Sequence, residues 1–137
     1  MRSALVPLTA VLGLAACYLG TKAERFDPAR KPQGVSAEVQ ARGRALQGEL
    51  LEVGASSLLL LTVGDHAGRV VLVAYSAIED ARFAQMSCCR IHGGAPPDER
   101  VRERLRQVSR FPQGLAPDLL QRILEDHGQS EPEGLRP

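Results

Sequence analysis

The chain of 137 residues carries 17 basic and 16 acidic side chains, which gives a formal net charge of +1 at pH 7. A chain this close to neutral has no net field to draw it onto nucleic acid, because that affinity comes mostly from neutralised phosphates. With no tryptophan, two tyrosines and three phenylalanines, the core must be built from leucine, valine, isoleucine and alanine. The length permits one small domain with tails.

The N-terminus has the pattern of an export signal. Arg2 supplies a positive start, and the uncharged, mostly apolar run that follows ends in Leu14-Ala15-Ala16-Cys17. This run is too short to cross a hydrocarbon core, which needs about 20 helical residues. It therefore predicts that residues 1–16 are a signal peptide, absent from the mature chain. Its removal takes away Arg2 and no acidic residue, so the mature chain is formally neutral.

Leu14-Ala15-Ala16-Cys17 resembles the lipobox of bacterial lipoproteins. In that family the cysteine receives diacylglycerol and an acyl chain, and the signal is cut just before it. The resemblance implies a protein anchored in a membrane of the cell envelope through Cys17, with its body in the periplasm or another extracytoplasmic space. It implies no cofactor beyond that covalent lipid. The alternative is an ordinary signal peptide, or an N-terminal membrane helix, with a chance cysteine.

Behind the lipidated cysteine, residues 17–40 contain prolines, glycines and scattered charges without a sustained apolar period, which predicts a flexible tether. From residue 41 to 86 the pattern changes to short runs rich in leucine and valine that alternate with turns, as in a β-meander. The expected strands cover residues 44–53, 57–63, 69–75 and 79–85.

Two of these strands have distinctive patterns. Gly48 marks a bend or a bulge in the first strand, and the unbroken apolar run of the second predicts burial on both of its faces. The residues of the first strand available for burial are Leu46, Leu50 and Val53.

The order of these runs is similar to that of Sm-like small β-barrels. In those barrels a glycine bends the first strand and an isoleucine after the third strand plugs one end, and Gly48 and Ile78 stand at the matching positions. The turn at residues 54–56 lacks the acidic or asparagine side chains with which RNA-binding members hold a base, so RNA binding is not carried over. The resemblance implies a small lipoprotein barrel of the Sm-like or SH3-like kind. The matching stretches are residues 48–53, 57–60, 70–73 and 76–78.

The rest of the sequence, residues 87–137, predicts a connector, two helices and a tail. Residues 87–97 show no helix or strand period, and 98–128 predict two helices, the first capped by Asp98 and the second opened by Pro117. The polar tail, 129–137, is expected to be disordered. The fold class expected is therefore α+β, mainly β, with a small barrel or bent antiparallel sheet of four to five strands followed by two C-terminal helices.

Cys88, Cys89 and His92 form the main cluster of side chains able to bind a metal or to undergo redox chemistry. A structural zinc needs four ligands and usually a spaced rather than adjacent cysteine pair, so His66 or His127 would have to complete the site. Adjacent cysteines can join only in a strained ring, which leaves intermolecular pairing or free thiols open. The alternative is an incidental feature of the loop.

The sequence predicts no enzyme, since it shows neither a Gly-x-Ser-x-Gly elbow nor a glycine-rich phosphate loop. We expect a structural or adaptor lipoprotein that binds another envelope protein or a second copy of itself. Leu120, Ile123 and Leu124 on the second helix are the candidate contact residues. The alternative is a metal-binding or thiol-redox lipoprotein that uses Cys88, Cys89 and His92.

Overall fold

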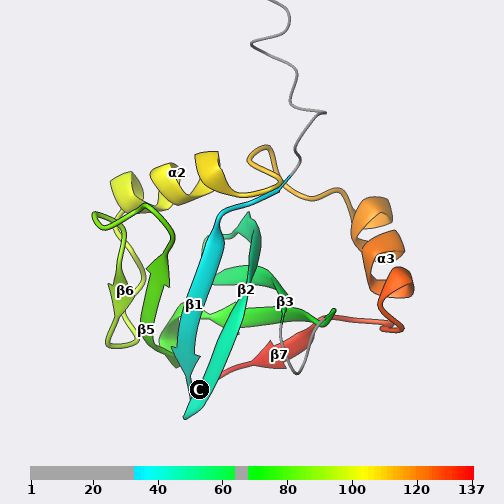
Figure 1. The fold of residues 1–137 in the computed structure, drawn as a ribbon, viewed down its shortest axis with the longest axis horizontal. Helices are drawn as coiled ribbons and strands as arrows, with labels where there is room; N and C mark the ends of the chain where they lie inside the picture. Colours follow the sequence, from blue (N-terminus) through cyan, green and yellow to red (C-terminus); the bar gives the residue numbers. More distant parts are fainter. Residues whose placement is uncertain (1–32, 64–67) are drawn as a thin grey trace, which may run out of the picture. The chain divides into compact units, whose positions relative to one another are not determined.

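A bent sheet of seven strands and two α-helices make up residues 33–63 and 68–137, the part of the chain that the computed structural model describes (Figure 1). The strand order is β6-β5-β1-β2-β3-β4-β7, and all neighbours are antiparallel except β4 and β7. The elements in chain order are β1 (Ser36–Ala41), β2 (Arg44–Val53), β3 (Ser57–Thr62), β4 (Val70–Ala74), the 3-10 turn η2 (Tyr75–Ala77), β5 (Ile78–Phe83), β6 (Ile91–His92), α2 (Glu99–Val108), α3 (Pro117–Asp126) and β7 (Glu133–Leu135).

The predicted α+β class is confirmed, and the predicted strands agree closely with β2, β3, β4 and β5. The bulge in β2, however, interrupts the pairing with β3 between Leu50 and Glu52 and not at Gly48. Gly48 has a different role, because a Cβ there would lie 2.5 Å from the carbonyl oxygen of Leu61. The glycine is required by the close approach of the neighbouring strand.

The expected tether overlaps a strand that the sequence analysis missed. Residues 36–40 belong to β1, which pairs with both β2 and β5 and so lies inside the sheet. Even before β1, Val35 donates its N–H to the carbonyl of Val108 and accepts from the N–H of Leu50, at 2.9 Å each. The chain is therefore fixed to the domain from about residue 34 onward. The rest of the expected tether, up to residue 32, lies outside the described residues.

Two further strands correct the predictions for the connector and the tail. The connector contains β6, which pairs with β5, and the tail contains β7, which pairs with β4. The tail is held because the amide of Gln129 bonds the backbone of Val70 twice, to its N–H at 2.7 Å and to its carbonyl at 3.1 Å. Leu135, the last residue of β7, is buried. These contacts replace the disorder that the polar composition of residues 129–137 indicates.

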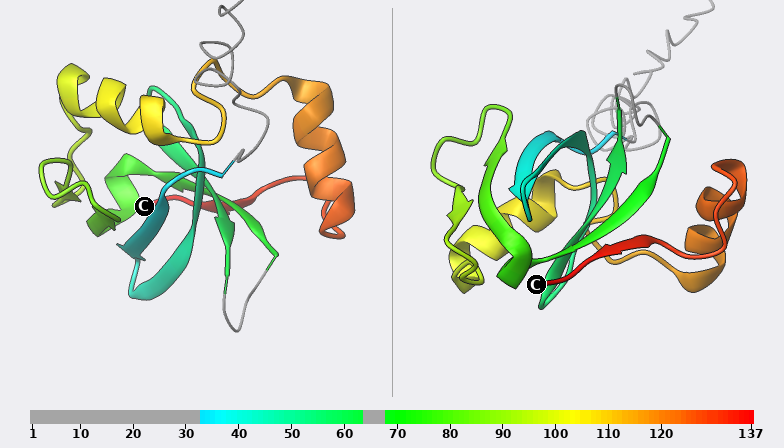
Figure 2. Two further views of the ribbon diagram at one scale, coloured as in Figure 1. Left: turned by 45° about the horizontal axis from the view of Figure 1, so that its top comes forward. Right: turned by 90° about the horizontal axis from the view of Figure 1, so that it is seen from below.

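The apolar side chains divide into two clusters on opposite faces of the sheet. Leu58 and Leu60 of β3 point into the inner cluster, with Leu105 of α2, whereas Leu59 packs on the outer face against Leu124 of α3. Burial of β3 on both faces is thus confirmed. The two helices accordingly lie beside different parts of the sheet, as the views of Figures 1 and 2 show.

Both helices begin where the sequence predicts. The Asp98 side chain accepts a hydrogen bond of 2.8 Å from the N–H of Val101 at the start of α2, and Pro117 is the first residue of α3. Within the described residues, no strand pair joins β6 at one edge to β7 at the other. The structure therefore shows a bent, open sheet.

Candidate functional site

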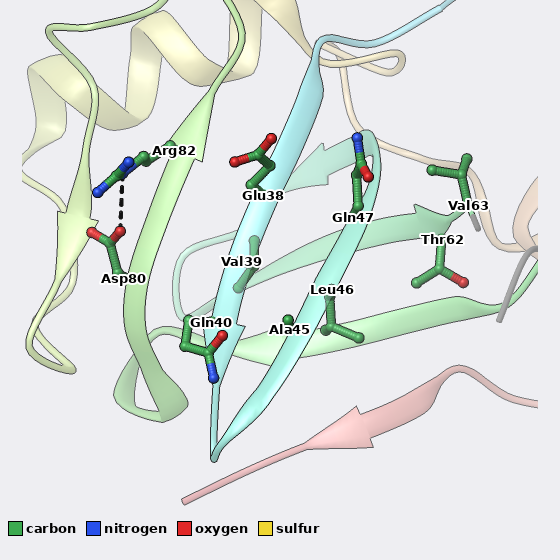
Figure 3. A pocket seen from close by; sticks show the side chains of 10 residues that line it. All are labelled: Glu38, Val39, Gln40, Ala45, Leu46, Gln47, Thr62, Val63, Asp80 and Arg82. Carbon is green, nitrogen blue, oxygen red and sulfur yellow. Dashed lines mark hydrogen bonds and ion pairs between the residues drawn. The ribbon is translucent and has the colours of Figure 1, made fainter. Parts of the chain in front are cut away.

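The outer face of β5, β1 and β2 carries a hollow of about 560 Å³ that is lined by strand residues and by Val63 (Figure 3). We call this region the open face and define it by Glu38, Gln40, Gln47, Asp80 and Arg82, with Val63 at the end of β3. These polar residues alternate along their strands with side chains of the inner cluster, so that strand geometry places them together. Val63, at 51% exposure, is the most exposed large apolar side chain in the described part of the chain.

Charges of both signs meet on the open face. Asp80 accepts from Arg82 at 3.1 Å and from Arg90 at 2.5 Å. The hydrogen bond from Arg90, more than that from Arg82, lowers the pKa of Asp80 below its usual value, so this carboxylate stays ionised at neutral pH. Glu38 is exposed and has no ion-pair partner among the residues described. A mixed, hydrated surface of this kind suits binding of a protein surface better than binding of a polyanion.

Cys88 and Cys89 lie in the loop between β5 and β6, where Cys89 N–H donates to the Met86 carbonyl at 3.0 Å and closes a turn. Cys88 is exposed, while Cys89 has no exposed surface and belongs to the inner cluster. Their Sγ atoms are 3.0 Å apart and not bonded to each other. Adjacent residues of the same type thus have opposite environments.

Arg104 of α2 adds a positive charge to this pair. Its Nη1 donates to Cys88 Sγ at 3.3 Å. The pKa of the Cys88 thiol is lowered, first by the hydrogen bond from Cys89 and then by the one from Arg104. Burial raises the pKa of Cys89 to about 11. At neutral pH the exposed sulfur is therefore the more reactive one, because the thiolate is the nucleophile.

His92 does not come together with Cys88 and Cys89 as a group that could hold a metal ion. Among residues 33–63 and 68–137, no three His, Cys, Asp or Glu side chains come together as a group that could hold a metal ion. His92 is exposed on β6, and His127 at the end of α3 contacts the Ile123 carbonyl through Nδ1 at 2.7 Å. His66 lies outside the described residues.

The apolar residues of α3 pack within the domain. Leu124 is 2% exposed, and Leu120 and Ile123 are half-buried against the same outer cluster. The apolar face predicted from their spacing is real, but β3 and β4 cover it. Leu124 is therefore covered within the domain, whereas Leu120 and Ile123 keep part of their surface exposed.

The sequence analysis did not identify the open face. The signal that could have found it is the alternation of polar and small apolar residues in Ser36–Ala41, where Glu38 and Gln40 stand between inward alanines and valine. Alanine has a weak preference for strands, so this alternation is a weak signal on its own.

Cys17 and the lipobox pattern lie outside the described residues. No helix within the described part of the chain is long and apolar enough to cross a membrane. Comparison of the chain with protein-family models, with curated proteins and with solved structures finds no match.

Proposed function

We propose that this protein is a lipoprotein of a bacterial cell envelope, anchored through Cys17, whose folded domain acts by binding as a structural or adaptor module. The lipobox pattern Leu14-Ala15-Ala16-Cys17 supports the anchor. The observation that carries the binding role is the open face, a hollowed surface of exposed and half-buried polar side chains. The partner is another envelope protein or a second copy of this chain.

The open face replaces α3 as the proposed contact surface. The apolar residues of α3 are already packed against β3 and β4, so a partner would have to displace them at a large cost in buried area. The open face needs no such displacement. Its exposed valine, Val63, adds apolar contact area to a surface that also carries charged groups, and this mixture is usual in a non-obligate protein interface.

We further propose that the domain is related to Sm-like or SH3-like small barrels. The contiguous order β5-β1-β2-β3-β4, the single 3-10 turn between β4 and β5, and the burial of Ile78 in the inner cluster support this relationship. RNA binding is not part of the proposal, for the reason given by residues 54–56.

The anchor is tested by intact mass of the mature protein extracted from its native membrane. We expect a chain that begins at Cys17 and carries diacylglycerol and an acyl chain. The Cys17→Ser variant should accumulate with its signal uncleaved. A mature chain that starts elsewhere and bears no lipid would overturn the anchor and leave the binding role standing.

The binding role is tested with a photo-cross-linking amino acid placed at Gln40 or Gln47 in cells. Both positions should give the same discrete adduct, and Val63→Asp should weaken it. Gln107, an exposed glutamine of α2, is the matched control and should give none of that adduct. Identical adducts from all three positions, or no adduct from Gln40 and Gln47, would contradict the proposal.

A further inference from the structure

The cysteine loop has a geometry that the proposed binding role does not use. The two Sγ atoms are 3.0 Å apart, whereas a disulfide bond is about 2.05 Å long, so an approach of about 1 Å would join them. One sulfur is open to solvent and the other is enclosed by the inner cluster. A reagent from solvent can therefore reach Cys88 and not Cys89.

The groups around Cys88 and Cys89 favour different protonation states for the two sulfurs. Arg104 is the cation in contact with Cys88, and the Cys89 sulfur lies within hydrogen-bond distance of the same atom. With Cys88 as a thiolate, Cys89 must be the donor of the bond between them, because a thiolate has no proton to give. The arrangement favours a charged Cys88 and a neutral Cys89.

We propose that Cys88 and Cys89 are a thiol–disulfide exchange site for organic disulfides, with Cys88 as the attacking sulfur and Cys89 as the resolving sulfur. In the first step the Cys88 thiolate attacks one sulfur of the disulfide, forms a mixed disulfide and releases the other half as a thiolate. That thiolate takes the Cys89 proton. Cys89 Sγ then attacks Cys88 Sγ, the mixed disulfide breaks, and the second half leaves as a thiolate that gains a proton from water.

The net reaction oxidises two protein thiols to one disulfide and reduces one organic disulfide to two thiols. The product joins adjacent residues in a small strained ring, which an external thiol reduces readily. The site is therefore reversible and suited to passing a disulfide on. His92, which the sequence analysis grouped with the two cysteines, takes no part in these steps.

The test treats the reduced full-length protein with oxidised glutathione, traps it at acidic pH, alkylates the remaining thiols and cleaves after arginine. Residues 83–90 form one fragment that holds both cysteines and excludes Cys17. We expect this fragment to lose the mass of two hydrogen atoms, with a glutathione adduct seen only at early times. In Cys89→Ala the adduct on Cys88 should persist, and in Cys88→Ser neither adduct nor disulfide should form.

Arg104→Gln should slow adduct formation severalfold and move its pH dependence to higher pH, while Arg100→Gln, an exposed arginine of the same helix, should change neither. A wild-type adduct as persistent as that of Cys89→Ala would overturn the resolving role. No reaction in wild type would overturn the site.

A second measurement does not depend on the folding of a core variant. Phenylarsine oxide joins two neighbouring thiols. When one equivalent is added to folded wild type and the protein is then unfolded, both Cys88 and Cys89 should resist alkylation, whereas both should be alkylated in unfolded protein that received no arsenical. Protection of only one cysteine, or of neither, would also refute the pairing. Cross-linking from Gln47 can still succeed in that case, so the two proposals fail separately.

Discussion

The outer face of the sheet has two halves that share one backbone geometry and differ in what covers them. On β3 and β4 the outward side chains are Leu59, Leu61 and Val70, and α3 packs over them. On β5, β1 and β2 the outward side chains are those of the open face, and strand residues together with Val63 line the hollow. Side-chain chemistry, and not strand pairing, decides which half is closed by the domain itself and which is left for solvent or a partner.

β2 crosses from one half to the other. Gln47 belongs to the open face, and four residues later Leu51 is fully buried in the outer cluster. The bulge between Leu50 and Glu52 returns Val53 to the inner cluster and leaves Glu52 outside, where its carboxylate accepts the N–H of Leu115 ahead of α3. One strand therefore marks the border between the closed and the open half.

The largest effect is expected from the covered half. Leu124→Ala removes a buried side chain from the contact between α3 and the sheet, and should lower the free energy of unfolding by about 2–5 kcal/mol. Gln47→Ala on the open face is the control and should lie within about 0.5 kcal/mol of wild type. Urea unfolding measures both. If both variants lost the same free energy of unfolding, the two halves would not differ in their contribution to stability.

The next effect concerns the link from α3 to β7. Gln129→Ala leaves the N–H and the carbonyl of Val70 without their side-chain partners, which should cost about 2–3 kcal/mol. Hydrogen exchange at the Val70 amide should accelerate before the rest of β4 does. Gln113, exposed ahead of α3, is a matched glutamine whose change to alanine should leave stability and exchange unaltered.

A pH-dependent effect is expected from Tyr75, which is buried in the inner cluster. Its hydroxyl donates to the Gly54 carbonyl at 2.7 Å, and burial raises its pKa to about 12 from 10.0. Because the folded state favours the neutral phenol, the stabilisation is fully present below pH 10 and is lost as pH rises toward 12. Tyr75→Phe should cost about 1 kcal/mol at neutral pH and show a flatter decline between pH 10 and 12. A decline as steep as that of wild type would assign the alkaline transition to another group.

The smallest effect is expected from the ion pairs of the open face. Asp80→Asn removes a half-buried carboxylate whose pKa is lowered by Arg90 and Arg82. Both arginines are exposed, and ion pairs at the surface contribute little to stability. The contribution of Asp80 is present above the ordinary carboxyl pKa and is lost as pH falls through the lowered one. The variant should therefore match wild type in thermal unfolding at neutral pH and lose slightly less stability in acid. A marked drop in melting temperature would show that this half is structural.

The sequence predicts the strongly patterned elements and misses those that depend on distant contacts. Leu58 to Leu60 and the capping residue Asp98 carry local signals, and the structure confirms both. β7 has three residues and no local signal, because it is held by Gln129 and by the edge of β4. The register of β1 uses alanines that composition assigns equally well to a linker.

The candidate site could be predicted only in part for a similar reason. The apolar face of Leu120, Ile123 and Leu124 is visible in the sequence, but its spacing cannot distinguish a partner's surface from β3 and β4 of the same chain. The cysteines were identified as the reactive cluster, whereas the opposite environments of Cys88 and Cys89, and the contact with Arg104, arise from packing of the loop on α2. The open face could not be predicted without β1, because Glu38 and Gln40 of that strand form part of it.

The short parallel strand β7 affects how the protein responds to proteolysis. β7 occupies the free edge of β4, whose residues Val70, Val71 and Val73 are almost fully buried. A protease cut after Ser130 would remove β7 and leave an apolar edge with unpaired backbone groups, the template on which a strand of another molecule adds. Clipped molecules should therefore associate through β4. By pairing with β4, β7 therefore prevents aggregation through that edge.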